Sequence, residues 1–124
     1  MDTFVKLDRL ETESKEIGFY WPDHYSSLKQ IIDEIEEVKE VLQNKGDNAI
    51  LQEELGDLLH AVCSLIFFCN FSVQETLEKA LDKYEYRFHS MIDIAEKQGV
   101  EDFSQLTLEQ MMNYWRLAKV LKHK

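Results

Sequence analysis

The sequence predicts an all-α fold, an antiparallel bundle of about five helices that homo-oligomerisation would complete. Two observations lead to this prediction. The 124 residues include only 4 Gly and 1 Pro, too few chain breakers for a many-turned β architecture. Those breakers separate long segments in which apolar residues recur every three or four positions, the spacing of an amphipathic helix. At this length we expect residues 1–124 to form a single domain, small enough to gain stability from self-association.

We expect the helices at residues 2–17, 24–44, 49–70, 72–97 and 107–121. The turn "NKGDN" separates the second from the third, and Gly46 is expected to take a positive φ there while Asp47 or Asn48 caps the next helix. The fourth begins at Ser72 with the capping-box pattern "SVQE", and the fifth begins at Thr107 in "TLEQ". Loops this short favour antiparallel neighbours.

The apolar spacing predicts that the second and third helices face each other. The stripe on the second helix is Leu28, Ile31, Ile35, Val38 and Leu42, and that on the third is Leu51, Leu55, Leu58, Val62, Leu65 and Cys69. After Leu58 the third helix is apolar on nearly every side. It is therefore expected either at the centre of the domain or in a subunit interface.

The charge balance and the cysteines narrow the class of function. A net charge of −10 argues against general nucleic-acid binding, because phosphate contacts need clustered Lys and Arg. Cys63 and Cys69 match no zinc or redox spacing and are expected to be buried free thiols, which suits a reducing cytoplasm. The N-terminus lacks the pattern of a signal peptide, and the apolar run "AVCSLIFFC" is too short to span a bilayer, so neither export nor membrane insertion is indicated.

Four carboxylates flank the facing stripes. At about 100° per residue, Glu34 and Glu54 lie roughly 60° from the centres of their stripes, and Glu37 and Asp57 roughly 120°. Counted outward from the turn at Gly46, Glu37 is level with Glu54, and Glu34 with Asp57. We therefore expect all four to converge across the hairpin.

Converging carboxylates in a partly apolar site repel one another unless a cation lies between them. A ligand set made only of oxygens suits Mg²⁺, with Mn²⁺ as a second possibility. Gly56, which stands between Glu54 and Asp57 in "LQEELGDLLH", would permit close approach by another helix or a ligand. The alternative is that all these acids are solvated on the surface of a strongly charged helix.

The fourth helix adds two cations. Its stripe is Leu77, Leu81, Tyr84, Phe88 and Met91. Lys83 and Arg87 stand on one flank of it, four residues apart, and suit phosphate oxygens. They could instead pair with Glu85 or with the acids of a neighbouring helix.

Together these motifs resemble the all-α nucleoside triphosphate pyrophosphohydrolases of the MazG type. "DEIEEV" and "EELGDLL" resemble the family's ExxE and ExxD metal-binding motif, "DHYSSLKQ" its THxSL stretch and "KYEYRF" its KFxxRF stretch. The resemblance covers residues from about 21 to 88. Leu81 departs from it, because members often carry Asn there.

The resemblance implies Mg²⁺-dependent hydrolysis of a nucleoside triphosphate (NTP or dNTP) to the monophosphate and pyrophosphate, by a homodimer or dimer-based tetramer. It makes Glu34, Glu37, Glu54 and Asp57 metal ligands. One acid, or a metal-bound hydroxide, would activate the attacking water. Glu37 and Glu54 are the candidate catalytic acids, and Glu37 is preferred because it should lie least deeply among apolar side chains. Lys83 and Arg87 would hold the departing pyrophosphate.

In the aromatic link "FYWPDH", Trp21 and His24 are candidates to bind the base, although the link could equally be a packed corner between helices.

Three alternatives remain from sequence. One is a related pyrophosphohydrolase acting on phosphoribosyl-ATP, dUTP or dCTP, and another is a non-enzymatic acidic interaction module. A di-iron bundle is suggested by His60, three residues after Asp57, but the chain has no second Glu-x-x-His element.

Overall fold

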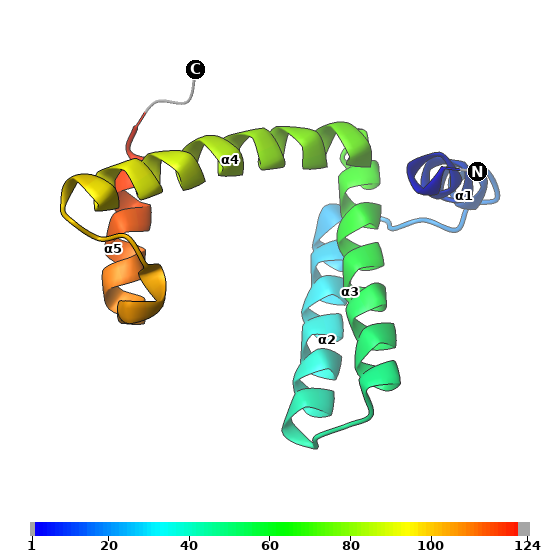
Figure 1. Ribbon diagram of the computed structural model, residues 1–124. Coiled ribbons are helices and arrows are strands. Elements are labelled where there is room, and N and C mark those ends of the chain that lie inside the picture. Colours follow the sequence, from blue (N-terminus) through cyan, green and yellow to red (C-terminus); the bar gives the residue numbers. More distant parts are fainter. Residues whose placement is uncertain (1, 122–124) are drawn as a thin grey trace. The chain divides into compact units, whose positions relative to one another are not determined.

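The computed structural model describes residues 2–121, and within them it contains five α-helices, one short 3₁₀ helix and no strand (Figure 1). The elements are α1 (Thr3–Glu16), α2 (His24–Gln43), α3 (Asn48–Phe68), α4 (Val73–Lys97), η1 (Phe103–Gln105) and α5 (Leu108–Lys119). The predicted all-α class and the five helices are confirmed. The chain divides into two compact units, residues up to Thr76 and residues from Leu77 onward, which we describe separately.

Side-chain caps fix where the helices begin. Asp23 caps α2 by accepting a hydrogen bond from the Ser26 N–H, which lowers the pKa of the Asp23 carboxyl. Asp47 caps α3 in the same way, one of the two caps expected there. At α5, Thr107 forms a complete capping box with Gln110. The predicted starts therefore agree with the structure to within about two residues.

The turn after α2 corrects one prediction. The positive φ belongs to Lys45, at +50°, and not to Gly46. The Gly46 N–H donates to the Val41 carbonyl at 2.9 Å, the six-residue hydrogen bond of a Schellman motif. A Cβ at Gly46 would lie 2.7 Å from Val41 Cγ1, so glycine serves here for close packing instead of for its φ range.

In the first unit, α2 and α3 form an antiparallel hairpin (Figure 1), as predicted. Their contact faces are shifted from the expected stripes. Leu28, Ile35 and Leu42 are 42%, 41% and 59% exposed. The buried and half-buried positions instead include Ser27, Ile31, Glu34, Val38 and Val41 on α2, and Leu51, Glu54, Leu58, Ala61 and Leu65 on α3. The helices have thus rotated so that two acids lie in the seam between them.

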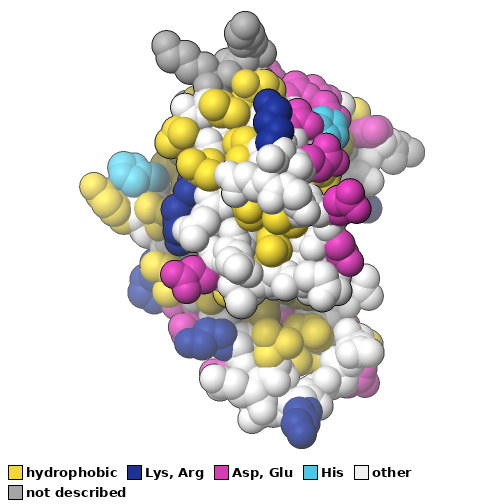
Figure 2. All heavy atoms as spheres, turned by 60° about the vertical axis from the view of Figure 1, so that its left-hand side comes forward, with side chains coloured by type: hydrophobic (Ala, Val, Ile, Leu, Met, Phe, Trp, Pro, Cys, Tyr) yellow, Lys and Arg dark blue, Asp and Glu magenta, His cyan; other side chains and the backbone are white. Residues whose placement is uncertain are grey.

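This rotation leaves much apolar surface open. Ile32, Leu55 and Leu59 are exposed on the same hairpin, and apolar side chains reach the surface in patches (Figure 2). The buried apolar side chains of residues 2–121 are few and small: Val38, Ala61, Val73, Ala95 and Ala118. The described chain therefore does not cover its own apolar faces.

In the second unit, aromatic contacts join α4 to α5. Tyr84 stacks on Phe88 and meets the ring of Trp115 at a centroid distance of 5.7 Å. Tyr114 donates a hydrogen bond to Gln98 at 2.9 Å. Ala95 and Ala118 are fully buried. The aromatic residues of α5 thus pack against their own unit.

Both cysteines are free, as predicted, but their burial differs from the prediction. Cys63 is half-buried, and desolvation raises the pKa of its thiol. Cys69 is exposed, because it lies at the C-cap of α3, beyond the seam.

Between Asp2 and Leu121, no single helix is both long and apolar enough to cross a membrane; α3 and α4 reach the required length and composition only when taken together as a bent pair.

Candidate functional site

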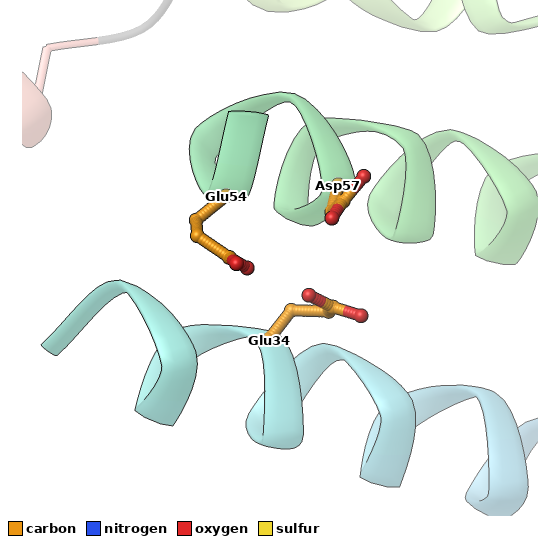
Figure 3. Close-up of side chains that lie close together, drawn as sticks. All are labelled: Glu34, Glu54 and Asp57. Carbon is orange, nitrogen blue, oxygen red and sulfur yellow. The ribbon is translucent and has the colours of Figure 1, made fainter. Parts of the chain in front are cut away.

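Three carboxylates meet at the seam of the hairpin. Glu34 reaches from α2 toward Glu54 and Asp57 on α3 (Figure 3), and one oxygen of each lies within 4.8 Å of the other two. Glu54 and Asp57 share a face because they are three residues apart on one helix. The antiparallel pairing of α2 with α3 then brings Glu34 level with them. Of the four acids predicted to converge, Glu37 is exposed and lies outside this group.

The acids influence one another electrostatically. The pKa of Glu54 is raised, first by desolvation and then by repulsion from Glu37, Asp57 and Glu34, in that order. Glu37 is therefore close enough to act on Glu54 although it does not join the group. A divalent cation would remove this repulsion, and a set of carboxylate oxygens with no sulfur or nitrogen is the donor set that Mg²⁺ accepts. The residues present fit such an ion.

Gln30 positions one of the acids. Its Nε2 donates to Glu34 Oε1 at 2.7 Å, one turn away on α2. This bond holds the carboxylate of Glu34 in place beside α3. Gln30 was missed in the sequence, although its spacing of four residues from Glu34 was a usable signal.

A cavity of about 620 Å³ opens beside the acids in the first unit. Its aromatic wall is Phe19, Tyr20, Trp21, Phe67 and Phe68. Its polar lining includes Glu11, Gln30, Glu34, Asp57, His60 and Ser64. Trp21, one of the two residues predicted to bind the base, thus lines the cavity. His24 is exposed and does not line the cavity; its ring lies 4.2 Å from that of Tyr25.

The far side of the cavity holds a polar cluster that joins α1 to α3. Glu11 Oε1 accepts a hydrogen bond from Ser64 Oγ at 2.7 Å and lies 3.0 Å from His60 Nε2. His60 therefore contacts Glu11 and is outside the acid group, which is at odds with its use as a di-iron ligand. Glu11 and Ser64 were not singled out in the sequence. His60 and Ser64 follow Asp57 by three and seven residues, a same-face spacing that could have signalled them.

The remaining predicted residues are not among those that line the cavity. Around Gly56 there is open space. Apart from its chain neighbours and the backbone of its own helix, no atom of the described residues lies within 4 Å of the place of a Cβ. Lys83 and Arg87 lie one turn apart on α4 in the second unit, the first exposed and the second half-buried. Among the described residues, neither forms an ion pair with Glu85, the alternative considered for them.

Comparison with known proteins points to one family. A family model described as the MazG nucleotide pyrophosphohydrolase domain matches residues 23–92. The chain is 33% identical over 111 residues to the nucleoside triphosphate pyrophosphohydrolase/pyrophosphatase MazG of Thermotoga maritima, covering 90% of this chain and 42% of that protein. It is 29% identical over 120 residues to the nucleoside triphosphate pyrophosphohydrolase of Escherichia coli K12, covering 96% of this chain and 45% of that protein.

The chain thus spans less than half the length of these curated relatives. The match of residues 23–92 includes the three converging acids, Glu37, and the two predicted phosphate-binding residues Lys83 and Arg87. Because this match covers more than half of the chain, the chain belongs to the MazG nucleotide pyrophosphohydrolase domain family, a family of hydrolases.

Proposed function

We propose that this domain hydrolyses nucleoside triphosphates, NTP or dNTP, to the monophosphate and pyrophosphate with Mg²⁺, or Mn²⁺ in its place. The main support is the group formed by Glu34, Glu54 and Asp57, whose oxygens lie within 4.8 Å of one another beside a cavity large enough for a small ligand. Family membership supports the reaction class. The curated relatives carry the name nucleoside triphosphate pyrophosphohydrolase.

The acids would divide the work between binding and catalysis. Glu34, Glu54 and Asp57 would hold the metal, with Glu37 joining them from its exposed position. When bound, the metal supplies positive charge that neutralises the phosphate oxygens during the displacement. Glu37 or Glu54 would accept the proton of the attacking water. The raised pKa of Glu54 favours it as a proton acceptor, while Glu37, in contact with solvent, has easier access to water.

Binding of the substrate would use the two ends of the nucleotide differently. Lys83 and Arg87 would hold the departing pyrophosphate through charge-assisted hydrogen bonds. Trp21, in the aromatic wall of the cavity, would stack on the base. His24 would have to move its ring away from that of Tyr25 in order to bind the base.

The proposal is tested by measuring pyrophosphate release from a panel of nucleotides. The panel contains the NTPs and dNTPs together with dUTP and phosphoribosyl-ATP, each with Mg²⁺ and with Mn²⁺. We expect turnover of at least one nucleotide, and its loss by more than about a hundredfold in Glu54→Gln. Glu53→Gln is the matched control, since Glu53 is the exposed neighbour outside the acid group and should keep activity. A folded protein that turns over nothing in the panel would refute the proposal.

We further propose that the domain acts as a homodimer or dimer-based tetramer. The support is the exposed apolar face of the hairpin, which includes Leu28, Ile35 and Leu42. A second copy would bury these side chains. Free thiols and strong negative charge fit a cytoplasmic location and a nucleotide substrate in place of a nucleic acid.

A further inference from the structure

The cavity has an acidic side chain that the proposed metal chemistry does not use. Glu11 of α1 lines the cavity with a side chain only 15% exposed. Ser64 Oγ and His60 Nε2 both contact its Oε1. Among the described residues its other oxygen, Oε2, has no hydrogen-bond partner. A half-paired carboxylate with so little exposure is a strong acceptor in need of a donor.

The surroundings of Glu11 offer acceptors as well. Ser64 gives its hydroxyl proton to Glu11, so only its lone pairs remain for a ligand. A carboxylate oxygen can only accept, so a hydrogen bond between His60 Nε2 and Glu11 requires that this nitrogen carries its proton and points it at Glu11. Lys15 also lines the cavity but is exposed. Toward a ligand, Glu11 and Ser64 can therefore only accept hydrogen bonds, and this edge of the cavity suits a ligand that carries N–H donors.

The position of this edge fits the length of a nucleotide. Asp57 and Ser64 are seven residues apart on one face of α3, a separation of about 10 Å along the helix axis. Phosphates held at Asp57 would leave the base at the other end of the cavity. Three residues of the aromatic wall, Trp21, Phe67 and Phe68, would flank the base.

We infer that Glu11, supported by His60 and Ser64, reads the base and favours nucleotides whose base carries an amino group. This inference rests on the proposed function of the acid group. Cytosine, adenine and guanine each present an amino N–H donor, whereas uracil and thymine present a carbonyl oxygen where cytosine has its amino group. The one edge N–H of uracil lies between two carbonyl oxygens, which would face the acceptors of Glu11 and Ser64.

Cytosine against uracil is the sharpest comparison, because the two bases differ only on this edge. We expect kcat/KM for dCTP to exceed that for dUTP by about tenfold or more, the effect of one hydrogen bond to a charged group. Glu11→Gln keeps the size of the side chain but replaces one oxygen with an amide donor. In this variant kcat/KM for dCTP should fall by about tenfold, while kcat/KM for dUTP should stay the same or rise.

Glu13→Gln is the matched control, since Glu13 is two residues further along α1, exposed, and outside the cavity lining. In Glu13→Gln, the ratio of kcat/KM for dCTP to kcat/KM for dUTP should equal that of the unchanged protein. If Glu11 only holds α1 against α3, Glu11→Gln will lower kcat/KM for dCTP and for dUTP by the same factor. That result overturns the inference. Should Glu11→Gln fail to fold, Glu11→Asp, which keeps the charge but shortens the reach, must lower the ratio.

A binding measurement separates this inference from the proposed function. Titration calorimetry with dCMP and dUMP needs no hydrolysis. Tighter binding of dCMP that disappears in Glu11→Gln supports base reading even if no nucleotide is turned over. Equal binding of the two, or binding of neither, overturns it, whether or not pyrophosphate release is observed.

Discussion

At the scale of single residues, the feature with the clearest physical consequence is the charge of Glu54. Its pKa is raised in the folded chain, so the ionised form is less favourable there than in the unfolded chain. For an acid shifted in this direction, stability is greatest at a pH below the ordinary glutamate pKa. This stability falls as the pH rises from the ordinary glutamate pKa through the raised pKa of the folded chain.

Glu54→Gln should therefore raise the Tm of the metal-free protein at neutral pH and flatten its pH dependence above the ordinary glutamate pKa. The same variant should lose the Tm increase that Mg²⁺ gives the unchanged protein, because binding to the folded state alone stabilises it. Differential scanning fluorimetry across pH, with and without Mg²⁺, checks both outcomes. A lower metal-free Tm for Glu54→Gln would show that the ionised carboxylate has a favourable partner.

At the scale of elements, Gly56 is the unusual position of α3. It lies inside the helix, where glycine is less favourable than alanine by about 1 kcal/mol, and no atom of the described chain lies near the place of its missing Cβ. No contact among residues 2–121 explains the glycine. A ligand or a second copy that approaches α3 closely would explain it.

We expect Gly56→Ala to raise the free energy of unfolding by about 0.5–1 kcal/mol and to lower metal-dependent turnover at least about tenfold. Chemical denaturation and pyrophosphate release measure the two effects. Gly99→Ala is the contrasting control: at a φ of +82° alanine is strained, so stability should fall by about 1 kcal/mol. Unchanged turnover in Gly56→Ala would remove the case for close approach at this position.

At the scale of the whole molecule, the exposed apolar face of α2 predicts self-association. Replacing both Leu28 and Ile35 with Ser should shift the mass measured by light scattering at micromolar concentration from a dimer or tetramer to a monomer. Leu108→Ser, at an exposed position on α5, should leave the mass unchanged. A monomeric mass for the unchanged chain would contradict the prediction.

The sequence by itself determined the elements. Caps such as Asp47 and Thr107 and the spacing of apolar residues are local signals, which act within a few positions of the chain. They located five helices and the hairpin that brings Glu34 to the level of Asp57. The sequence did not predict the positive φ of Lys45, because the choice between Lys45 and Gly46 depends on packing against Val41.

Only the tertiary structure decided which faces of the helices meet. A rotation of α2 and α3 about their axes changes no local contact. Periodicity predicted that Glu34, Glu54 and Asp57 converge, but it could not tell that Leu28 and Ile35 remain exposed. No local sequence pattern predicts the hydrogen bond between Glu11 and Ser64 either, because the two residues are 53 positions apart. Contacts of that range depend on how whole helices dock, and they are what turns a set of acids and aromatic residues into a cavity.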